Sequence, residues 1–348
     1  MSLLHGVGEF FSLDIGTNSM RIVQLNGNSD RGWSLSRYAY IPVTEQITND
    51  NSEAGRRRLG EAIMGAVHQA GIKTKNVAIG LPSSRTFTSI VETATLPEKE
   101  LEKTFRYEID KYVPMPMSEA KADYIVLGAS PNDPNKTEIL VSSVAKDYAE
   151  STMETIEKTG LNIIAMEPEP LAMARALVPP GAMDAVMVVD FGEKSTDIVV
   201  VYRNQPRLVR SVPGGFGSFV QTLSSGLGVR GDQARQFILK FGLAEDKVEG
   251  QVIRTLNHLL ESFASELIKS ARFFQTKYVN SKIGGIVLSG CASIIPLFPE
   301  YIEARTNIPA MNGNPWQLVR TSDAQKRALM PVASEFAVAI GLSERSND

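Results

Sequence analysis

The spacing of apolar residues along the chain predicts an α/β protein in which short buried strands alternate with amphipathic helices. Residues 53–70 place apolar side chains at helical spacing and end at Gly71, which indicates a helix followed by a glycine stop. Residues 76–81 form a short apolar run closed by Pro82, a pattern typical of a buried strand. Residues 245–279 predict one long amphipathic helix or a close pair of helices.

Residues 86–166 carry a pattern of their own, which suggests a small module inserted into the surrounding α/β fold. The expected order is β-α-β-β-α-β, and the loop PNDPNK at 131–136 joins the two central strands. The expected strands are 88–96, 122–128, 137–145 and 161–166, and the expected helices are 98–113 and 146–160. Modules of this kind usually make protein contacts, and this segment contains no recognisable catalytic set.

These patterns divide the chain of 348 residues into three parts, and the length is sufficient for two lobes that each bury a core. The first lobe covers 8–85 and is completed by a bridge helix at 167–182 and a C-terminal helix at 331–345. The inserted module, expected to bind a partner, covers 86–166, and the second lobe covers 183–330.

The strongest signal in the sequence is an internal repeat. Residues 13–28 (LDIGTNSMRIVQLNGN) and 189–204 (VDFGEKSTDIVVVYRN) align at an offset of 176 residues (190 − 14), and six of sixteen positions are identical. A chance alignment would give roughly one identity at average residue usage. In each copy an apolar strand ends in Asp-x-Gly, small or polar residues follow, and a second apolar strand leaves, which predicts a hairpin.

The turn of each hairpin has the chemistry of a phosphate-binding loop, because glycine lets the backbone approach a ligand and the polar residues supply donors. Asp14 and Asp190 end their strands where a hydrated Mg²⁺ would lie, and Mg²⁺ prefers a few carboxylates plus retained waters. A single Asp-x-Gly turn would be an ordinary hairpin, whereas two copies with shared flanking residues favour phosphate. The loop residues are Gly16, Thr17, Asn18 and Ser19 in the first copy and Gly192, Glu193, Lys194, Ser195 and Thr196 in the second.

Other glycine-rich segments of the chain also bear on phosphate and nucleotide binding. Gly214 and Gly215 stand just before a predicted helix and can present backbone amides to a phosphate. The pattern G-x-G-x-x-G at Gly226, Gly228 and Gly231 follows a helical segment instead of a strand, so it is not a dinucleotide fingerprint. The sequence contains no G-x-x-x-x-G-K-[ST], so a nucleotide site in this chain is not a P-loop.

Composition and charge narrow the class of protein. Hydrophobic residues make up 43% and charged residues 22%, which is ordinary for a soluble globular protein. The net charge of −3 gives no electrostatic reason to expect nucleic acid or an anionic membrane as a partner. One cysteine and three histidines leave almost no ligands for a His/Cys zinc site. The N-terminus lacks a charged leader and no long apolar stretch occurs, so we expect a cytoplasmic protein.

Taken in order, the segments LDIGTNSMRIVQL, EPLAMARAL, VVDFGEKSTDIVVV and IVLSGCASIIP resemble the actin-like ATPases. The stretches YEIDKYVPMPMSEAKADYIVLG and MEPEPLAMAR are similar in particular to the PilM family of type IV pilus assembly proteins. The resemblance covers nearly the whole chain. It implies a two-lobed actin-like fold, ATP and Mg²⁺ as cofactors, and a cytoplasmic platform protein recruited to the inner membrane face.

The resemblance also implies roles for residues outside the hairpins. Gly290, Cys291, Ala292 and Ser293 would form the turn that supports adenosine, although Cys291 also suits a small packing role. Glu169 falls where related proteins place a residue that orients the attacking water; the alternative is an acid favoured by a helix N-terminus. In PilM proteins the inserted module and its cleft hold a short cytoplasmic tail of the membrane protein PilN. The run YVPMPM at 112–117 is the candidate contact, and burial inside the module is the alternative.

The chain departs from its relatives at several positions of the implied nucleotide site. Arg235 and Ile238 stand on the adenosine-clasping helix where relatives carry an acidic residue and a lysine, and Cys291 stands where glycine is usual. Glu193 adds a negative charge inside the second phosphate loop, which should weaken phosphate binding unless Lys194 or Mg²⁺ neutralises it. We therefore expect nucleotide binding to be weak or less selective for adenine.

Three functions are compatible with these features, and the sequence favours the first. It is an assembly platform that binds nucleotide and hydrolyses it slowly or not at all. The second is an FtsA-like division tether, although such proteins usually end in an amphipathic membrane helix and this chain ends in SERSND. The third is an ATP-dependent kinase on the same fold, for which no aspartate base is recognisable.

Overall fold

The computed structural model describes residues 8–28 and 32–345, and the chain divides into two compact units. The first unit consists of Met1–Ala176 and Pro315–Asp348, and the second consists of Leu177–Asn314. Residues 1–7 and 346–348 lie outside the described residues. The expectations about an N-terminal leader and a C-terminal membrane helix fall partly on these residues and stay predictions.

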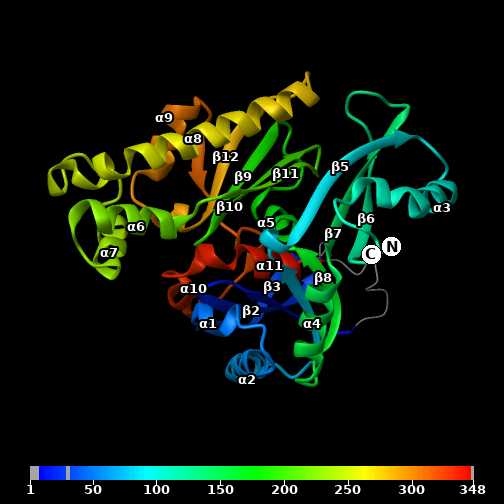
Figure 1. Ribbon diagram of the computed structural model, residues 1–348, viewed down its shortest axis with the longest axis horizontal. Coiled ribbons are helices and arrows are strands. Elements are labelled where there is room, and N and C mark those ends of the chain that lie inside the picture. Colours follow the sequence, from blue (N-terminus) through cyan, green and yellow to red (C-terminus); the bar gives the residue numbers. More distant parts are fainter. Residues whose placement is uncertain (1–7, 29–31, 346–348) are drawn as a thin grey trace. The chain divides into compact units, whose positions relative to one another are not determined.

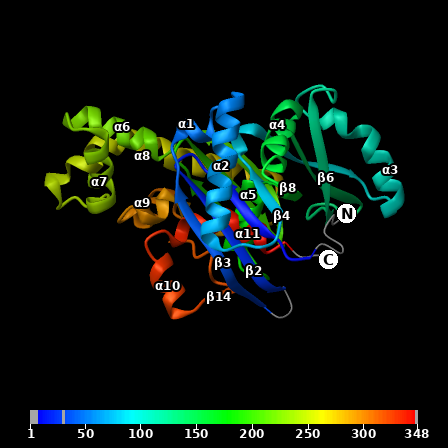
Figure 2. The ribbon, with the colours of Figure 1, turned by 90° about the horizontal axis from the view of Figure 1, so that it is seen from below.

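A six-stranded sheet in the order β14-β3-β2-β1-β4-β8 forms the centre of the first unit (Figure 1). Because successive strand residues face opposite sides, Phe11 and Leu13 pack against α2 (Glu53–Ala70), while Ser12 donates a hydrogen bond of 2.6 Å to Ala339 O of α11 (Ala337–Ser343). Helices therefore cover both faces, and Figure 2 shows α2 lying across the strands. The strands are β1 (Phe11–Ile15), β2 (Ser19–Asn28), β3 (Gly32–Pro42), β4 (Asn76–Leu81), β8 (Asn162–Pro168) and β14 (Val319–Arg320).

The helix and strand expected at 53–70 and 76–81 have these bounds in the structure, and local capping explains the helix ends. The Ser52 hydroxyl accepts a hydrogen bond from the Gly55 amide, and Gly71 stops α2 in a left-handed conformation with φ of 67°. The remaining short elements of this unit are α1 (Glu45–Thr48), η1 (Ser83–Arg85), α5 (Glu169–Leu177), α10 (Asp323–Leu329) and η5 (Ala333–Phe336).

The inserted module has a three-stranded sheet in the order β5-β7-β6, with α3 packed on one face through Phe105, Ile139 and Val141. The expected fourth strand of the module is wrong, because β8 pairs in parallel with β4 and joins the large sheet. This pairing places Leu161, Ile163 and neighbouring apolar side chains in the core beneath α2. The elements are β5 (Thr86–Ala94), α3 (Glu98–Glu108), η2 (Ile109–Tyr112), β6 (Ala120–Ala129), β7 (Lys136–Ala145) and α4 (Lys146–Glu157).

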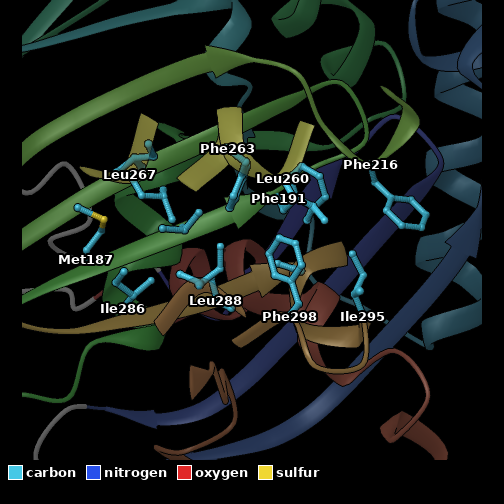
Figure 3. Packing of buried hydrophobic residues seen from close by; sticks show 14 of the residues in the cluster. Met187, Phe191, Phe216, Leu260, Phe263, Leu267, Ile286, Leu288, Ile295 and Phe298 are labelled. Carbon is cyan, nitrogen blue, oxygen red and sulfur yellow. The ribbon is translucent and has the colours of Figure 1, made fainter. Parts of the chain in front are cut away.

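The second unit is built on a five-stranded sheet in the order β11-β10-β9-β12-β13. Its core joins Phe191 of β9 with aromatic side chains from three helices, and Figure 3 shows Phe216, Phe263 and Phe298 around it. The strands are β9 (Ala185–Phe191), β10 (Ser195–Tyr202), β11 (Gln205–Pro213), β12 (Ile283–Gly290) and β13 (Ala310–Asn312). The helices are α6 (Phe216–Leu227), α7 (Gly231–Phe241), η3 (Val248–Gly250), α8 (Gln251–Lys277), η4 (Cys291–Ile294) and α9 (Phe298–Thr306).

Two expectations about this unit are resolved by the structure. The long amphipathic segment is a single helix, α8, of 27 residues. The boundary at residue 330 is wrong, because β14 pairs with β3 and takes residues 315–330 into the first unit. Trp316 explains the difference: its ring packs on Phe336 and its indole N–H donates to Ala333 O, both in the C-terminal segment.

Candidate functional site

The two repeated hairpins share one backbone hydrogen bond in their turns. The Gly16 amide donates to Ser19 O at 3.0 Å, and the Gly192 amide donates to Ser195 O at the same distance. Each turn joins antiparallel strands, with Asp14 opposite Arg21 in the first copy and Asp190 opposite Asp197 in the second. The repeat predicted from sequence is therefore a repeat of backbone structure, one copy in each unit.

In the first loop, an arginine holds the aspartate that the sequence assigns to the metal. Arg21 Nη1 lies 3.0 Å from Asp14 Oδ2, and Arg21 Nη2 lies 2.9 Å from Glu335 Oε2. The Tyr40 hydroxyl donates to the same Glu335 carboxylate at 3.1 Å, and the Ser19 hydroxyl lies 3.3 Å from it. The loop is thus tied through Arg21 to η5, close to the C-terminal helix.

Burial determines the electrostatics of this cluster. Desolvation raises the pKa of Asp14, whose residue is only 3% exposed, and the charge of Arg21 opposes that increase. Burial lowers the pKa of Arg21, but the charges of Asp14 and Glu335 outweigh it and raise the value. Gly16 makes room for the pair, since a Cβ there would lie 2.7 Å from Arg21 Nη1.

In the second loop, Glu193 pairs with Arg235 of α7, and Arg235 Nη2 lies 2.5 Å from Glu193 Oε1. Backbone amides at and just before the start of α6 donate hydrogen bonds to this loop. The Phe216 amide donates to Gly192 O and the Gly217 amide to Glu193 O, both at 2.9 Å, while the Gly214 amide donates to Lys194 O at 3.1 Å. The amides at the start of α6 therefore hold the loop backbone in place, and Gly215 allows the close contact.

The turn assigned to adenosine lies directly beside the second loop. β12 runs parallel to β9, so Gly290 is paired with Phe191, and a Cβ at Gly290 would lie 2.7 Å from Asp190 Oδ1. Gly290 has φ of +63°, which also favours glycine. The Ser293 hydroxyl donates to Gly290 O at 2.7 Å and closes the turn. Of the other turn residues, Ala292 is fully buried in the core and Cys291 is half-buried against it.

Two further residues singled out in the sequence have clear positions. Ile238 is fully buried in the core of the second unit, so its side chain cannot line a ligand surface. Glu169 begins α5 and lies over the end of β4, where a Cβ at Gly80 would be 2.9 Å from Glu169 Cγ. Burial raises the pKa of Tyr148, and the charge of Glu169 raises it further. The Arg85 guanidinium lies 5.3 Å from the centre of the Tyr148 ring.

The run at 112–117 on the module is divided between burial and exposure. Tyr112, Val113 and Met115 pack on the module core, whereas Pro114 and Pro116 are exposed and Met117 is 39% exposed. The run borders a shallow hollow of about 440 Å³ lined by Asp110, Val113, Pro114, Met115, Pro116 and Met117. A larger groove of about 760 Å³ lies between α2 and α4, where Gly60 meets Thr159.

Sequence reasoning missed the partners that hold the first loop, namely Arg21, Tyr40 and Glu335. A signal for Arg21 was present, because it lies directly across the predicted hairpin from Asp14. The signal for Glu335 was absent, since it lies 314 residues from Arg21 along the chain.

Two features are absent from the residues that the structure describes, namely a membrane-spanning helix and a cluster of metal ligands. No helix there has the length and apolar character needed to cross a membrane. Within the same residues, no group of three or more His, Cys, Asp or Glu side chains is arranged to hold a metal ion.

The two units, each with its own sheet and its own glycine-turn hairpin, have the actin-like ATPase fold that the sequence predicts. The chain is similar to the PilM-PilN type IV pilus biogenesis complex, with a TM-score of 0.81, 20% identity, and 98% of this chain and 99% of that chain covered. It is also similar to MreB5 of Spiroplasma citri bound to ADP, with a TM-score of 0.54, 12% identity, and 96% and 95% covered. The protein belongs to the family of the type IV pilus assembly protein PilM, whose family model matches residues 12–347.

A curated relative lies outside pilus assembly. The chain is 26% identical over 231 residues to the cell division protein FtsA of Neisseria meningitidis serogroup B (strain ATCC BAA-335 / MC58). The match covers 59% of this chain and 53% of FtsA, so the chain spans about half the length of that relative.

Proposed function

We propose that this protein is a cytoplasmic, ATP-binding platform of type IV pilus assembly that binds the cytoplasmic tail of a PilN-like inner-membrane protein. The observation that carries the proposal is the similarity in fold to the PilM-PilN complex over 98% of the chain. Membership of the PilM family supports the role in pilus assembly independently of the fold. In this proposal the tail of the partner recruits the protein to the inner membrane face.

The nucleotide part of the proposal depends on the two hairpin loops. The loop glycines and hydroxyls suit phosphate, and the turn at Gly290 lies beside the second loop, where it can support adenosine. Asp14 and Asp190 are the proposed magnesium ligands, acting through water, and the ion would neutralise phosphate charge. At Asp14 the ion would share the carboxylate with Arg21. Glu169 is the proposed water-positioning residue of a slow ATPase.

The first experiment is calorimetric titration of the purified protein and of Asp190→Ala with ATP, with and without Mg²⁺. We expect the substitution to reduce magnesium-dependent affinity by about tenfold or more, since it removes a carboxylate beside the loop. Asp232→Ala is the matched control, because Asp232 is an exposed aspartate on α7 of the same unit, paired with Arg230 just before that helix. Equal affinity in all three proteins would show that Asp190 does not belong to the nucleotide site. An assay without detectable ATP hydrolysis would favour a platform over a kinase.

The second experiment locates the partner contact on the module. We expect Met117→Asp to weaken binding of a synthetic PilN-like N-terminal peptide by about tenfold, because it places a charge on the exposed apolar end of the 112–117 run. Fluorescence polarisation measures the affinity. The control is Met330→Asp, which changes a methionine of the same unit that is 79% exposed and lies outside the module. Undiminished binding by Met117→Asp would direct the search to the groove between α2 and α4.

An FtsA-like membrane tether is the second candidate, favoured by the sequence similarity to FtsA. The two functions differ in whether the protein binds lipid without a partner. Co-sedimentation of the purified protein with anionic lipid vesicles would support the tether. Recruitment to vesicles only when they display the PilN-like peptide would support the platform.

A further inference from the structure

Two charged residues of the second unit, one on the second loop and one on α7, meet in space. Glu193 places a negative charge inside the loop, and Arg235 of α7 carries a positive charge. They are 42 residues apart in sequence, and Arg235 Nη2 lies 2.5 Å from Glu193 Oε1. The charge that would repel a phosphate is therefore neutralised inside the protein, by Arg235.

The surroundings hold both side chains in place. The Arg235 guanidinium lies 4.8 Å from the centre of the Phe216 ring at the start of α6, a cation–π contact. The Glu193 side chain passes over Gly217, where a Cβ would lie 3.2 Å from Glu193 Oε1 and 3.0 Å from Glu193 O. A Cβ at that position would be in tight contact with the loop, so the pair packs against a glycine and an aromatic ring of the same helix.

The pair is accessible to a ligand from solution. The side chain of Arg235 is 37% exposed and that of Glu193 is 20% exposed. Arg235 Nη2 donates to Glu193, and a guanidinium has five N–H donors, so the group can also bind a second acceptor. A guanidinium binds phosphate oxygens through the same paired geometry that it uses for a carboxylate.

We propose that Arg235 is a phosphate-binding residue of the second loop and that the Glu193 carboxylate competes with a nucleotide phosphate for it. The inference rests on the proposed binding of ATP and concerns the strength of that same site. A phosphate that binds the loop must displace Glu193 from Arg235 or share the arginine with it. The loop therefore carries a competing anion of its own, which lowers its affinity for nucleotide.

The test compares ATP·Mg²⁺ affinity in the wild type, Glu193→Gln, Arg235→Gln and the double variant. Glutamine at position 193 keeps an oxygen that can accept from Arg235, so the loop stays folded while its charge is lost. We expect Glu193→Gln to bind about tenfold more tightly and Arg235→Gln about tenfold more weakly than the wild type, by the effect of one charge in a half-buried site. The effects of the two substitutions should be non-additive, because each residue is the other's partner.

The control for loss of one negative charge is Glu261→Gln. Glu261 of α8 forms an ion pair of 2.8 Å with Arg305 of α9 in the same unit, and neither residue belongs to the loop. It should leave ATP affinity at the wild-type value. Inorganic tripolyphosphate, titrated in parallel, shows whether the changes arise from the phosphates and not from adenosine.

Each result decides between the inference and the proposed function. Wild-type binding with no gain in Glu193→Gln would overturn the competition while ATP binding stands. No binding by the wild type with clear binding by Glu193→Gln would support the competition and show that Glu193 silences the loop. Absence of binding in all variants, with ATP and with tripolyphosphate, would overturn both Arg235 as a phosphate ligand and the proposed binding of ATP.

Discussion

The two hairpins share the hydrogen bond of their turns but differ in charge at several positions, one of which faces the first aspartate. Arg21 and Asp197 occupy equivalent positions, each directly across the strand pair from the first aspartate of its hairpin. The first hairpin thus contains an internal ion pair, whereas the second places two aspartates opposite each other. One sequence pattern therefore describes two hairpins whose cross-strand charge pairs differ.

Glu344, at the end of α11, links stability to pH. The residue is only 7% exposed, burial raises its pKa from 4.5 to about 8, and the charge of Arg175 only partly offsets this. The folded protein therefore binds this proton more tightly than the unfolded chain. The stabilisation is complete below the unfolded pKa of 4.5 and is lost as the pH rises through about 8.

We expect Glu344→Gln to remove most of this loss, since a neutral amide replaces the carboxyl group. The wild type should lose roughly 3 kcal/mol or less of unfolding free energy between pH 5 and 9 through this group, and the variant should stay nearly level. Urea unfolding at several pH values measures the difference. Glu157→Gln, at an exposed position of α4, should follow the wild type. Parallel curves for Glu344→Gln and the wild type would contradict the account.

At the scale of elements, α5 and α11 pack in direct contact. A Cβ at Gly341 would lie 1.8 Å from Ala172 O and 2.4 Å from its carbonyl carbon, so the helices touch through backbone. The Gly341 carbonyl also accepts a hydrogen bond from Arg175, which is bound in turn to Glu167. Glu167 is the shared carboxylate of Arg175 and Arg345, and these contacts tie the C-terminal helix to β8.

Gly341→Ala should therefore destabilise the protein by about 3 kcal/mol, because the methyl group meets backbone that cannot move alone. Gly65→Ala is the matched control, since Gly65 lies in α2 with nothing within 4 Å of its Cβ position. That substitution should stabilise by roughly 0.5–1 kcal/mol through helix propensity. Chemical denaturation compares the two, and a Gly341→Ala protein as stable as the wild type would refute the close contact.

At the scale of the whole molecule, the chain is a duplicated architecture with an insertion. Each unit has its own sheet and its own hydrophobic core, and each carries one copy of the hairpin. The chain leaves the first unit for the second at residue 177 and returns at residue 315. The return adds β14 to the first sheet, and the C-terminal segment then packs on the face opposite α2.

The sequence by itself determined the features that depend on local order. The repeat at 13–28 and 189–204, the bounds of α2 and β4, and the glycine turns follow from periodicity, capping and backbone conformation, which act over a few residues. The family was recognisable for the same reason, because its motifs are contiguous stretches, and the family match confirms it.

Only the tertiary structure decided which distant groups meet. The pairing of β8 with β4, the return of residues 315–330 to the first unit, and the contact of Arg21 with Glu335 join segments that no local pattern connects. The same holds for Glu193 and Arg235, which the sequence presents as two separate anomalies and the fold brings into one ion pair. A charge has no periodicity, so its partner is fixed only when the packed helices and strands determine the distance between the two groups.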